Sequence, residues 1–420
     1  MKFHKRNEWL RKNKLEILCF FMIIIVFVLR SPQLIINGRF WAEEGRDYFQ
    51  YAYNHNIIET VFFVYKRCGY YYLWVNICVL LASLFPLEYA PAIVTWLAFG
   101  MNVLIYAYIF WTPSLVLKSR FSKTWFCLLS VIGVHITAEV YCNAINSQVF
   151  FGIFMLCYFF RDIDKINLLL PKKKKVYLII SNILLIIACL SGLYALILFP
   201  AFFLRYCLKR RKDDKVTLIY MVTPLIIQMV VFFLSSVEGT SGRSLSFFNV
   251  QAINYTILHT IIIPVFGNSI AARISEPVIY ILLISLGVYC FVVKKRVRNS
   301  IIFQLIGLLS YYVIFVNGAS LGGGGAGGRY AVVPVSILLL LFAFIFQNRV
   351  NHFCTIISVI LIVLPLWFGI VEYQSPKNYK VLDYYNAPNW KEEVAAYNAN
   401  SNYSLRIWPY QKSWTITLDD

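Results

Sequence analysis

The stretch YAVVPVSILLLLFAFIF, at residues 330–346, decides the class of fold. It runs for 17 residues without a charged side chain, and a helix needs about 20 apolar residues to cross a bilayer. Similar runs recur along the 420-residue chain, which is 60% hydrophobic and 14% charged. An ordinary soluble domain carries about 25% charged residues. The composition therefore predicts an all-α polytopic membrane protein, and it excludes a soluble enzyme, a disordered chain and a disulfide scaffold.

The apolar runs predict about eleven membrane crossings, within a range of roughly 10 to 13. Candidate spans lie near residues 15–30, 70–87, 90–111, 124–141, 147–161, 176–190, 191–206, 216–236, 277–293, 300–317, 330–346 and 353–372. Another apolar stretch, 255–272, is interrupted by Pro264 and Gly267 and is expected to be re-entrant or interfacial. We assign residues 1–372 to a transmembrane bundle and the polar residues 373–420 to a small outer tail.

The basic residues predict the orientation of these spans. The net charge is +19, but the lysines and arginines gather in short loops between apolar runs, at Lys2–Lys14, Lys118–Lys123, Arg161–Lys175, Lys209–Lys215, Lys294–Arg298 and Gln347–His352. Such loops face the cytoplasm in inner-membrane proteins, so the charge does not indicate nucleic acid. We expect a plasma-membrane protein with a cytoplasmic N-terminus and an outward-facing C-terminus. Runs 70–87 and 90–111 then cannot both cross, because loop 31–69 lies outside and Lys118 inside.

The first outer loop, 31–69, concentrates acidic residues in the segment NGRFWAEEGRDYFQYA, residues 37–52. Glu43, Glu44 and Asp47 lie close together there, flanked by Arg39 and Arg46. In a helix, residues 43 and 47 share one face. Clustered carboxylates suit a general base for a sugar hydroxyl or a site for a hard divalent cation. The alternative is a solvated loop in which the acids pair with the arginines.

The segment FWAEEG, residues 40–45, resembles the first outer loop of GT-C-type membrane glycosyltransferases, and the many spans and the polar outer tail fit the same layout. Within that superfamily it is most similar to bacterial enzymes that decorate the O-antigen of lipopolysaccharide, including serotype-converting glucosyltransferases. The resemblance implies a GT-C-like bundle in which an acid of this loop is the catalytic base or a cation ligand. Glu43 takes the place of the first acid and Glu44 that of the second. The resemblance leaves open which of them acts, and it requires no cofactor beyond an optional divalent cation.

A second segment, GGGGAGGRY at residues 322–330, predicts a phosphate site. Glycine-rich backbone exposes N–H groups to an anion, and Arg329 can bind phosphate through two parallel hydrogen bonds. The resembled family has an Arg–Tyr pair in a similar place, which implicates Tyr330 as well. Arg243 and Arg273 lie on the outer side, where arginine is rare. They are candidates for the same lipid phosphate, unless they only snorkel to phosphates of the bilayer.

Five further residues are candidates for binding the acceptor sugar: Trp41, Asn143, Asn146, Tyr194 and Trp414. The two asparagines sit at an outer turn, where their amides either hydrogen-bond sugar hydroxyls or cap a helix. The tryptophans either stack on sugar faces or belong to an interfacial aromatic belt. Tyr194 follows a Ser-Gly turn that either simply joins two spans or faces the site, as similar turns do in the resembled enzymes.

Together these features predict inverting transfer of a hexose, glucose by resemblance, from a polyprenyl-phosphate-linked donor to a surface polysaccharide or lipid-linked glycan at the periplasmic face. The expected partners are that donor, the glycan acceptor and membrane lipid. A lipid-linked glycan flippase or a polysaccharide polymerase is the alternative, because both share this composition. A secondary transporter fits less well, since the chain shows no internal repeat. The concentration of acids in the first outer loop favours the transferase.

Overall fold

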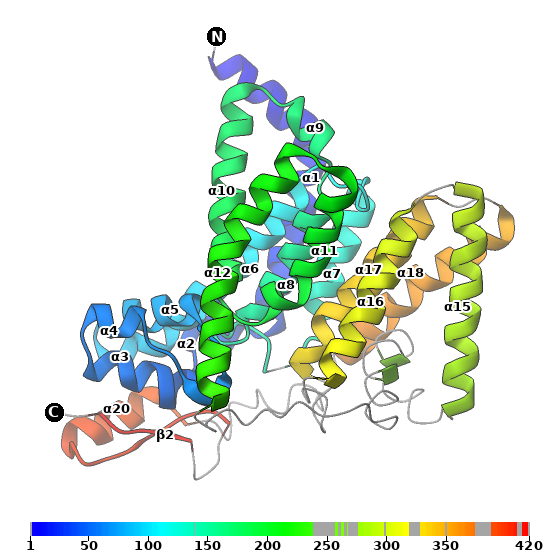
Figure 1. Ribbon diagram of the computed structural model, residues 1–420. Coiled ribbons are helices and arrows are strands. Elements are labelled where there is room, and N and C mark those ends of the chain that lie inside the picture. Colours follow the sequence, from blue (N-terminus) through cyan, green and yellow to red (C-terminus); the bar gives the residue numbers. More distant parts are fainter. Residues whose placement is uncertain are drawn as a thin grey trace.

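The computed structural model of this chain describes residues 2–137, 139–237, 257–258, 262–263, 267, 276–297, 300–318, 328–348, 351–373, 388–409 and 414–418. Nearly all of the regular structure in these ranges is helical. Figure 1 shows long helices standing beside one another, with a smaller lobe of short helices next to one end of the bundle. Arg243, Arg273, the glycines at 322–327 and most of the stretch 255–272 lie outside the described residues.

The bundle is built around two helices that are buried on all sides. Every residue of α8 (Ser147–Phe159) is buried, and so is every residue of α17 (Val332–Gln347) from Val332 to Ile345. A helix that is apolar all round belongs in the centre of an assembly. Around this centre lie α1 (Lys2–Arg30), α6 (Ala90–Trp111), α7 (Arg120–Ile132), α10 (Pro171–Cys189), α11 (Tyr194–Lys209), α12 (Lys212–Val237), α15 (Glu276–Val297), α16 (Ile301–Gly318) and α18 (His352–Tyr373), with the short α9 (Ile163–Asn167) and η5 (Gly328–Ala331) between them.

Several of these helices carry the length and surface of membrane-spanning segments. Among the described residues, four stretches are long and apolar enough to cross a bilayer: Leu87–Trp111, Lys212–Ser235, Arg329–Gln347 and His352–Val371. The outward face of α1 exposes the apolar stripe Leu18, Phe21, Ile25 and Leu29. Exposed apolar surface of this extent is typical of contact with lipid. The chain is therefore a mostly helical, membrane-associated protein.

Two of the expected spans are shorter than the sequence suggests. Run 70–87 forms only α5 (Leu73–Ser83), whose 11 residues rise about 16 Å against a hydrocarbon layer of about 30 Å. Its apolar face packs on α6 and the first-loop helices instead of on lipid. Run 124–141 is helical only to Ile132: the chain turns at Gly133, and the described residues from there to 146 are not helical.

The lobe at one end combines the first loop with the tail. The first loop supplies α2 (Pro32–Asn37), the π-helix η1 (Glu44–Phe49), α3 (Gln50–Asn54), α4 (Ile57–Val61) and η2 (Lys66–Cys68), followed by α5 and η3 (Leu87–Tyr89). The tail adds α20 (Trp390–Ala399) and a small antiparallel hairpin, β1 (Leu405–Arg406) and β2 (Thr415–Ile416). Phe40, Phe49, Val394 and Ile407 belong to one apolar core. First loop and tail thus fold as a single unit, although more than 300 residues separate them.

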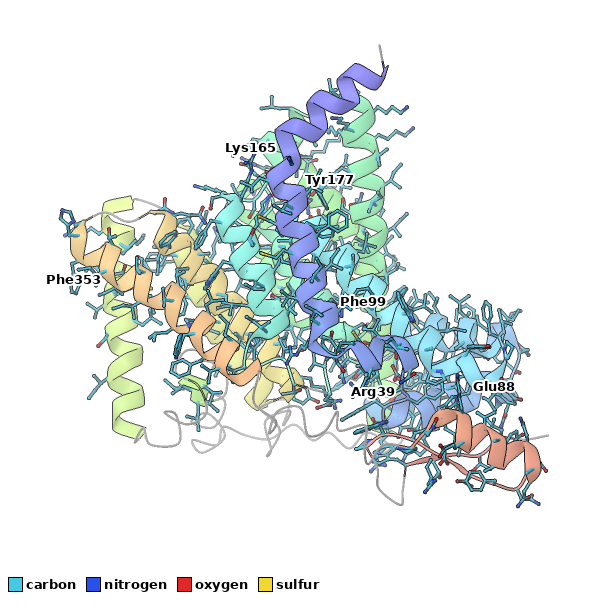
Figure 2. The ribbon with its side chains drawn as sticks, turned by 180° about the vertical axis from the view of Figure 1, so that it is seen from behind. Arg39, Glu88, Phe99, Lys165, Tyr177 and Phe353 are labelled. Atoms are coloured by element: carbon cyan, nitrogen blue, oxygen red, sulfur yellow. The ribbon has the colours of Figure 1, made fainter. Side chains whose placement is uncertain are left out.

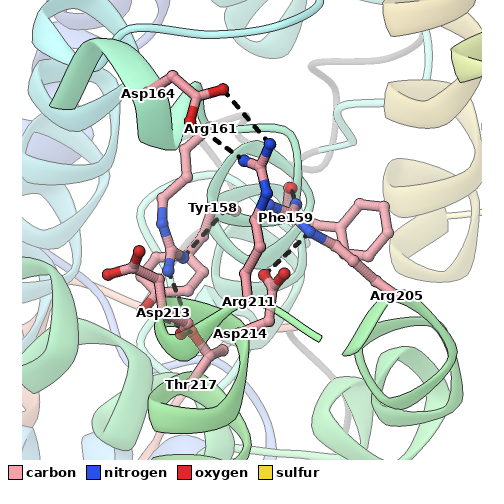
Figure 3. Close-up of polar contacts among 9 residues, drawn as sticks. All are labelled: Tyr158, Phe159, Arg161, Asp164, Arg205, Arg211, Asp213, Asp214 and Thr217. Carbon is pink, nitrogen blue, oxygen red and sulfur yellow. Dashed lines mark hydrogen bonds and ion pairs between the residues drawn. The ribbon is translucent and has the colours of Figure 1, made fainter. Parts of the chain in front are cut away.

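The opposite end of the bundle gathers the basic loops. Arg120 pairs with Glu16 of α1 (2.9 Å), and the backbone N–H of Lys118 donates to Gln347 at the end of α17 (3.2 Å). Figure 3 shows a third junction, where Arg211 pairs with Asp164 (3.4 Å) and Arg205 of α11 with Asp214 of α12 (3.0 Å). These contacts tie the basic connections to one another and to the N-terminal helix, away from the lobe that carries the acidic segment.

Candidate functional site

The carboxylate of Glu44 joins the first loop to the turn at residues 143–146. Its Oε2 accepts the backbone N–H of Trp41 (3.1 Å), and its Oε1 accepts that of Ala144 (2.7 Å). The side chain is only 1% exposed. Two nearby residues have a positive backbone φ: Ala42, two residues before Glu44, at 48°, and Cys142, two residues before Ala144, at 47°. Non-glycine residues keep that conformation only where the surroundings impose it, so the Glu44 contact fixes both segments.

Burial raises the pKa of Glu44 from 4.5 to about 7, although the amides of Ala144 and Trp41 and the charge of Arg39 act in the opposite direction. A pKa near neutrality suits a general base. In the structure both oxygens already accept backbone hydrogen bonds and the side chain is buried, so Glu44 connects the first loop to the turn.

The other two acids of the first loop have different surroundings. Asp47 accepts hydrogen bonds from the Nε and Nη2 of Arg46, the shorter at 2.8 Å. Glu43 is half-buried, and within the described part of the chain its carboxylate has neither a hydrogen bond nor an ion pair. The three carboxylates thus have three different settings. Among the described residues no group of three His, Cys, Asp or Glu side chains converges as a divalent-cation site would require.

The turn after α7 is held by its own asparagines. The Oδ1 of Asn143 accepts the backbone N–H of Asn146 (3.0 Å), and the Nδ2 of Asn146 donates to the carbonyl of Glu139 (2.8 Å). Both asparagines are buried. One polar atom of each, Nδ2 of Asn143 and Oδ1 of Asn146, is buried without a partner in the described structure. Buried polar atoms are normally paired, so the turn retains bonding capacity beside Glu44.

Arg329 lies on the other side of this turn, against Glu139. Its Nη1 donates to the Glu139 carboxylate at 2.8 Å, and its guanidinium lies 5.2 Å from the ring centre of Tyr330. Both charged side chains remain about a third exposed. Glu139 lies in an apolar run, where an acid needs a partner, and Arg329 is that partner. A carboxylate therefore occupies the guanidinium face that we expected to bind phosphate.

Arg329 and Tyr330 also line a small pocket with Tyr194 and residues that the sequence did not single out. Tyr70, Gln148 and Tyr312 complete its polar lining. The Nε2 of Gln148 donates to the hydroxyl of Tyr70 (3.1 Å), and Tyr312 donates to the carbonyl of Tyr330 (3.0 Å). In a chain with 29 tyrosines, no spacing signal distinguishes these from the rest.

The predicted aromatic residues meet beside the acids. The rings of Trp41 and Trp408 stack at 6.3 Å with an interplanar angle of 11°. Trp414 packs against the same pair, and the guanidinium of Arg46 lies 4.2 Å from its ring centre. Arg39, a flanking residue in the sequence, lies 4.5 Å from the ring of Trp41 and donates to the carbonyl of Tyr141 (3.0 Å). Trp41 and Trp414 therefore belong to the junction between first loop and tail.

Two polar clusters thus lie at the same end of the bundle, joined by the turn at 139–148. One contains Glu43, Glu44 and the tryptophans, and the other contains Glu139, Arg329 and the tyrosine-lined pocket.

Comparisons of this chain with protein-family models, with curated proteins and with solved structures found no match in any of the three. The likeness to GT-C glycosyltransferases therefore rests on the sequence segments themselves.

Proposed function

We propose that this chain is an inverting membrane glycosyltransferase that moves a hexose from a polyprenyl-phosphate carrier to a glycan acceptor. The supporting observation is that the segments carrying Glu43 and Arg329 both contact one buried turn. Glu44, next to Glu43, accepts the N–H of Ala144. Asn146 of the same turn donates to the carbonyl of Glu139, whose carboxylate pairs with Arg329. Transfer from a lipid phosphate needs a base for the acceptor hydroxyl. It also needs positive charge where the leaving phosphate gains negative charge. The first loop and the start of α17 supply these two groups.

In the proposed reaction, Glu43 takes the proton of the acceptor hydroxyl. The hydroxyl oxygen forms a bond to the anomeric carbon as the bond between that carbon and the phosphate oxygen breaks. Arg329 and Tyr330 bind the leaving polyprenyl phosphate, with Arg329 exchanging Glu139 for the phosphate. A single displacement inverts the anomeric configuration. Glu44 holds the first loop against the turn, and no step requires a divalent cation.

We also propose eleven crossings, made by α1, α6, α7, α8, α10, α11, α12, α15, α16, α17 and α18. The helices α7 and α8 have only 13 residues each and are included because, unlike α5, they stand within the bundle of long helices. The short α5 stays with the outer lobe, which removes the conflict between runs 70–87 and 90–111. The basic connections then all fall on the cytoplasmic side. The first-loop lobe and the tail fall on the periplasmic side of a bacterial inner membrane, where a flipped polyprenyl donor presents its sugar.

The test is mass spectrometry of the host surface polysaccharide with the chain intact, deleted or carrying Glu43→Gln. Loss of one hexose per repeat in the deletion and in Glu43→Gln, with normal amounts of the variant in the membrane, is the expected result. Exposed Glu59→Gln, in α4 of the same lobe, is the matched control and should leave the hexose in place. Unchanged repeats with altered chain length or trapped intermediates would point instead to the polymerase or flippase alternative.

A further inference from the structure

A cleft of about 460 Å³ lies between the first loop, the start of α6 and the tail. This volume is within the range of about 300–1,000 Å³ that is common for ligand sites. Its walls come from three segments distant in the sequence, residues 36–40, 88–92 and the tail residues 388–391 and 406–408. Figure 2 shows two of the wall residues, Arg39 and Glu88, in the lobe that also carries α20.

Close backbone contacts and hydrogen bonds hold the walls of the cleft in place. Gly38 has φ of +68°, and a side chain there would collide with the backbone of Ala92 at 2.3 Å, so the first loop rests directly on α6. The indole of Trp390 donates to the carbonyl of Leu87 (2.8 Å), and the backbone N–H of Trp408 donates to the carbonyl of Phe40 (3.1 Å). These contacts hold the tail at a fixed distance from the first loop and keep the cleft between them.

The lining combines aromatic rings with two charged side chains that have no partner in the described structure. Trp390, Trp408 and Tyr89 contribute rings, and Tyr89 is 58% exposed. Glu88 and Lys391 lie on different walls, and in the described structure neither side chain has an ion pair or a hydrogen bond. Apolar ring faces pack on the C–H faces of a sugar, while charged groups with free bonding capacity bind its hydroxyls. This chemistry fits a saccharide better than an acyl chain.

One wall of the cleft belongs to the same segment as the proposed base. Phe40 lines the cleft, and Glu43 follows three residues later in the same segment. That segment is fixed to the tail because the N–H of Ala42 donates to the carbonyl of Trp408 (2.5 Å). A chain of sugars in the cleft would therefore run along the polypeptide that carries Glu43.

We propose that this cleft binds the acceptor saccharide, with Tyr89, Glu88 and Lys391 as contact residues that determine its affinity. The proposal rests on the function proposed above and relocates the acceptor site. The asparagines of the 143–146 turn are buried and Trp414 packs on Trp41 and Trp408, whereas these three side chains line an open cleft.

The test is a titration of the full-length protein in detergent with repeat-unit oligosaccharides released from the host surface polysaccharide, followed by tryptophan fluorescence. Trp390 and Trp408 are the reporters because they line the cleft. We expect saturable quenching, with the oligosaccharide affinity lowered about fivefold by Tyr89→Ala, since one lost ring contact contributes about 1 kcal/mol. Glu88→Gln and Lys391→Gln should also lower the affinity for the oligosaccharide.

Two matched controls separate the cleft from general surface effects. Phe85→Ala removes an exposed ring from the same connection, and Arg67→Gln removes an exposed cation from the same lobe, but neither residue lines the cleft. Both should stay within about twofold of the unmodified protein. No saturable quenching at millimolar oligosaccharide, or equal effects of Tyr89→Ala and Phe85→Ala, would overturn the proposal.

The result is separable from that of the transferase proposal. Binding in the cleft without any hexose transfer would support the saccharide site and count against the transferase alone. Transfer whose KM for acceptor is unchanged by Tyr89→Ala and Glu88→Gln would overturn the cleft and leave the transferase in place.

Discussion

Neighbouring acids of one loop reach different states because their surroundings differ. Glu44 is enclosed and accepts two backbone N–H groups, and Asp47 is held by Arg46. Glu43 is half-buried and has no partner among the described residues. A carboxylate acts as a general base only where the substrate proton is within its reach, whatever its pKa. The residue with the raised pKa is therefore a structural contact, and the available acid is its neighbour.

The Glu44 carboxyl predicts a pH-dependent stability. Its pKa is about 7 in the fold against an ordinary 4.5, so the folded chain binds the proton more tightly than the unfolded chain. Its contribution is fully present below pH 4.5 and is lost as the pH rises through 7. We expect the apparent melting temperature in detergent to fall between pH 5 and pH 8, and Glu44→Gln to flatten that slope.

The same variant should lower stability at pH 5. Glutamine has one oxygen where the carboxyl group has two, so one buried N–H loses its acceptor at a cost of about 1–3 kcal/mol. Exposed Glu59→Gln should preserve the slope. An undiminished slope in Glu44→Gln would show that other groups cause the pH dependence.

Among the elements, the junction of α11 and α12 depends on a buried ion pair (Figure 3). The side chains of Arg205 and Asp214 are 8% and 7% exposed. Asp214→Asn leaves the guanidinium buried without its counter-charge and should cost about 3–5 kcal/mol. Asp164→Asn breaks the exposed pair with Arg211 and should change stability by about 0–1 kcal/mol. Melting curves of the two variants measure the contrast, and similar losses would contradict it.

The ion pair at the start of α17 leads to a second prediction about the helices. Because Arg329 pairs with Glu139, we expect Arg329→Gln to raise the KM for polyprenyl-phosphate sugar and Glu139→Gln to lower it by freeing the guanidinium. Arg329→Lys should restore part of the loss, because it keeps the charge but not the bidentate geometry. A steady-state assay with varied donor measures these changes. Parallel effects of the Arg329 and Glu139 substitutions would mean that the pair acts only as a structural contact.

For the whole molecule, the separation of a basic end from an acidic lobe predicts the orientation in the membrane. Single cysteines introduced by Ile58→Cys in the lobe and Lys173→Cys at the basic end, in a background without the native cysteines, report on it. A membrane-impermeant maleimide should label position 58 in intact spheroplasts, and position 173 only after permeabilisation. Labelling of both positions, or of 173 alone, in intact spheroplasts would refute the topology.

The amino-acid sequence by itself determined that the chain is helical and membrane-associated, because apolar runs and basic loops follow from local composition. It also identified Glu43, Glu44, Arg329 and Tyr330 as residues of interest. Only the tertiary structure decided that α5 stays in the lobe, that Glu139 pairs with Arg329 across 190 residues, and that the tail closes on the first loop. Burial and pairing depend on which distant segments meet, and hydropathy describes each segment without its neighbours.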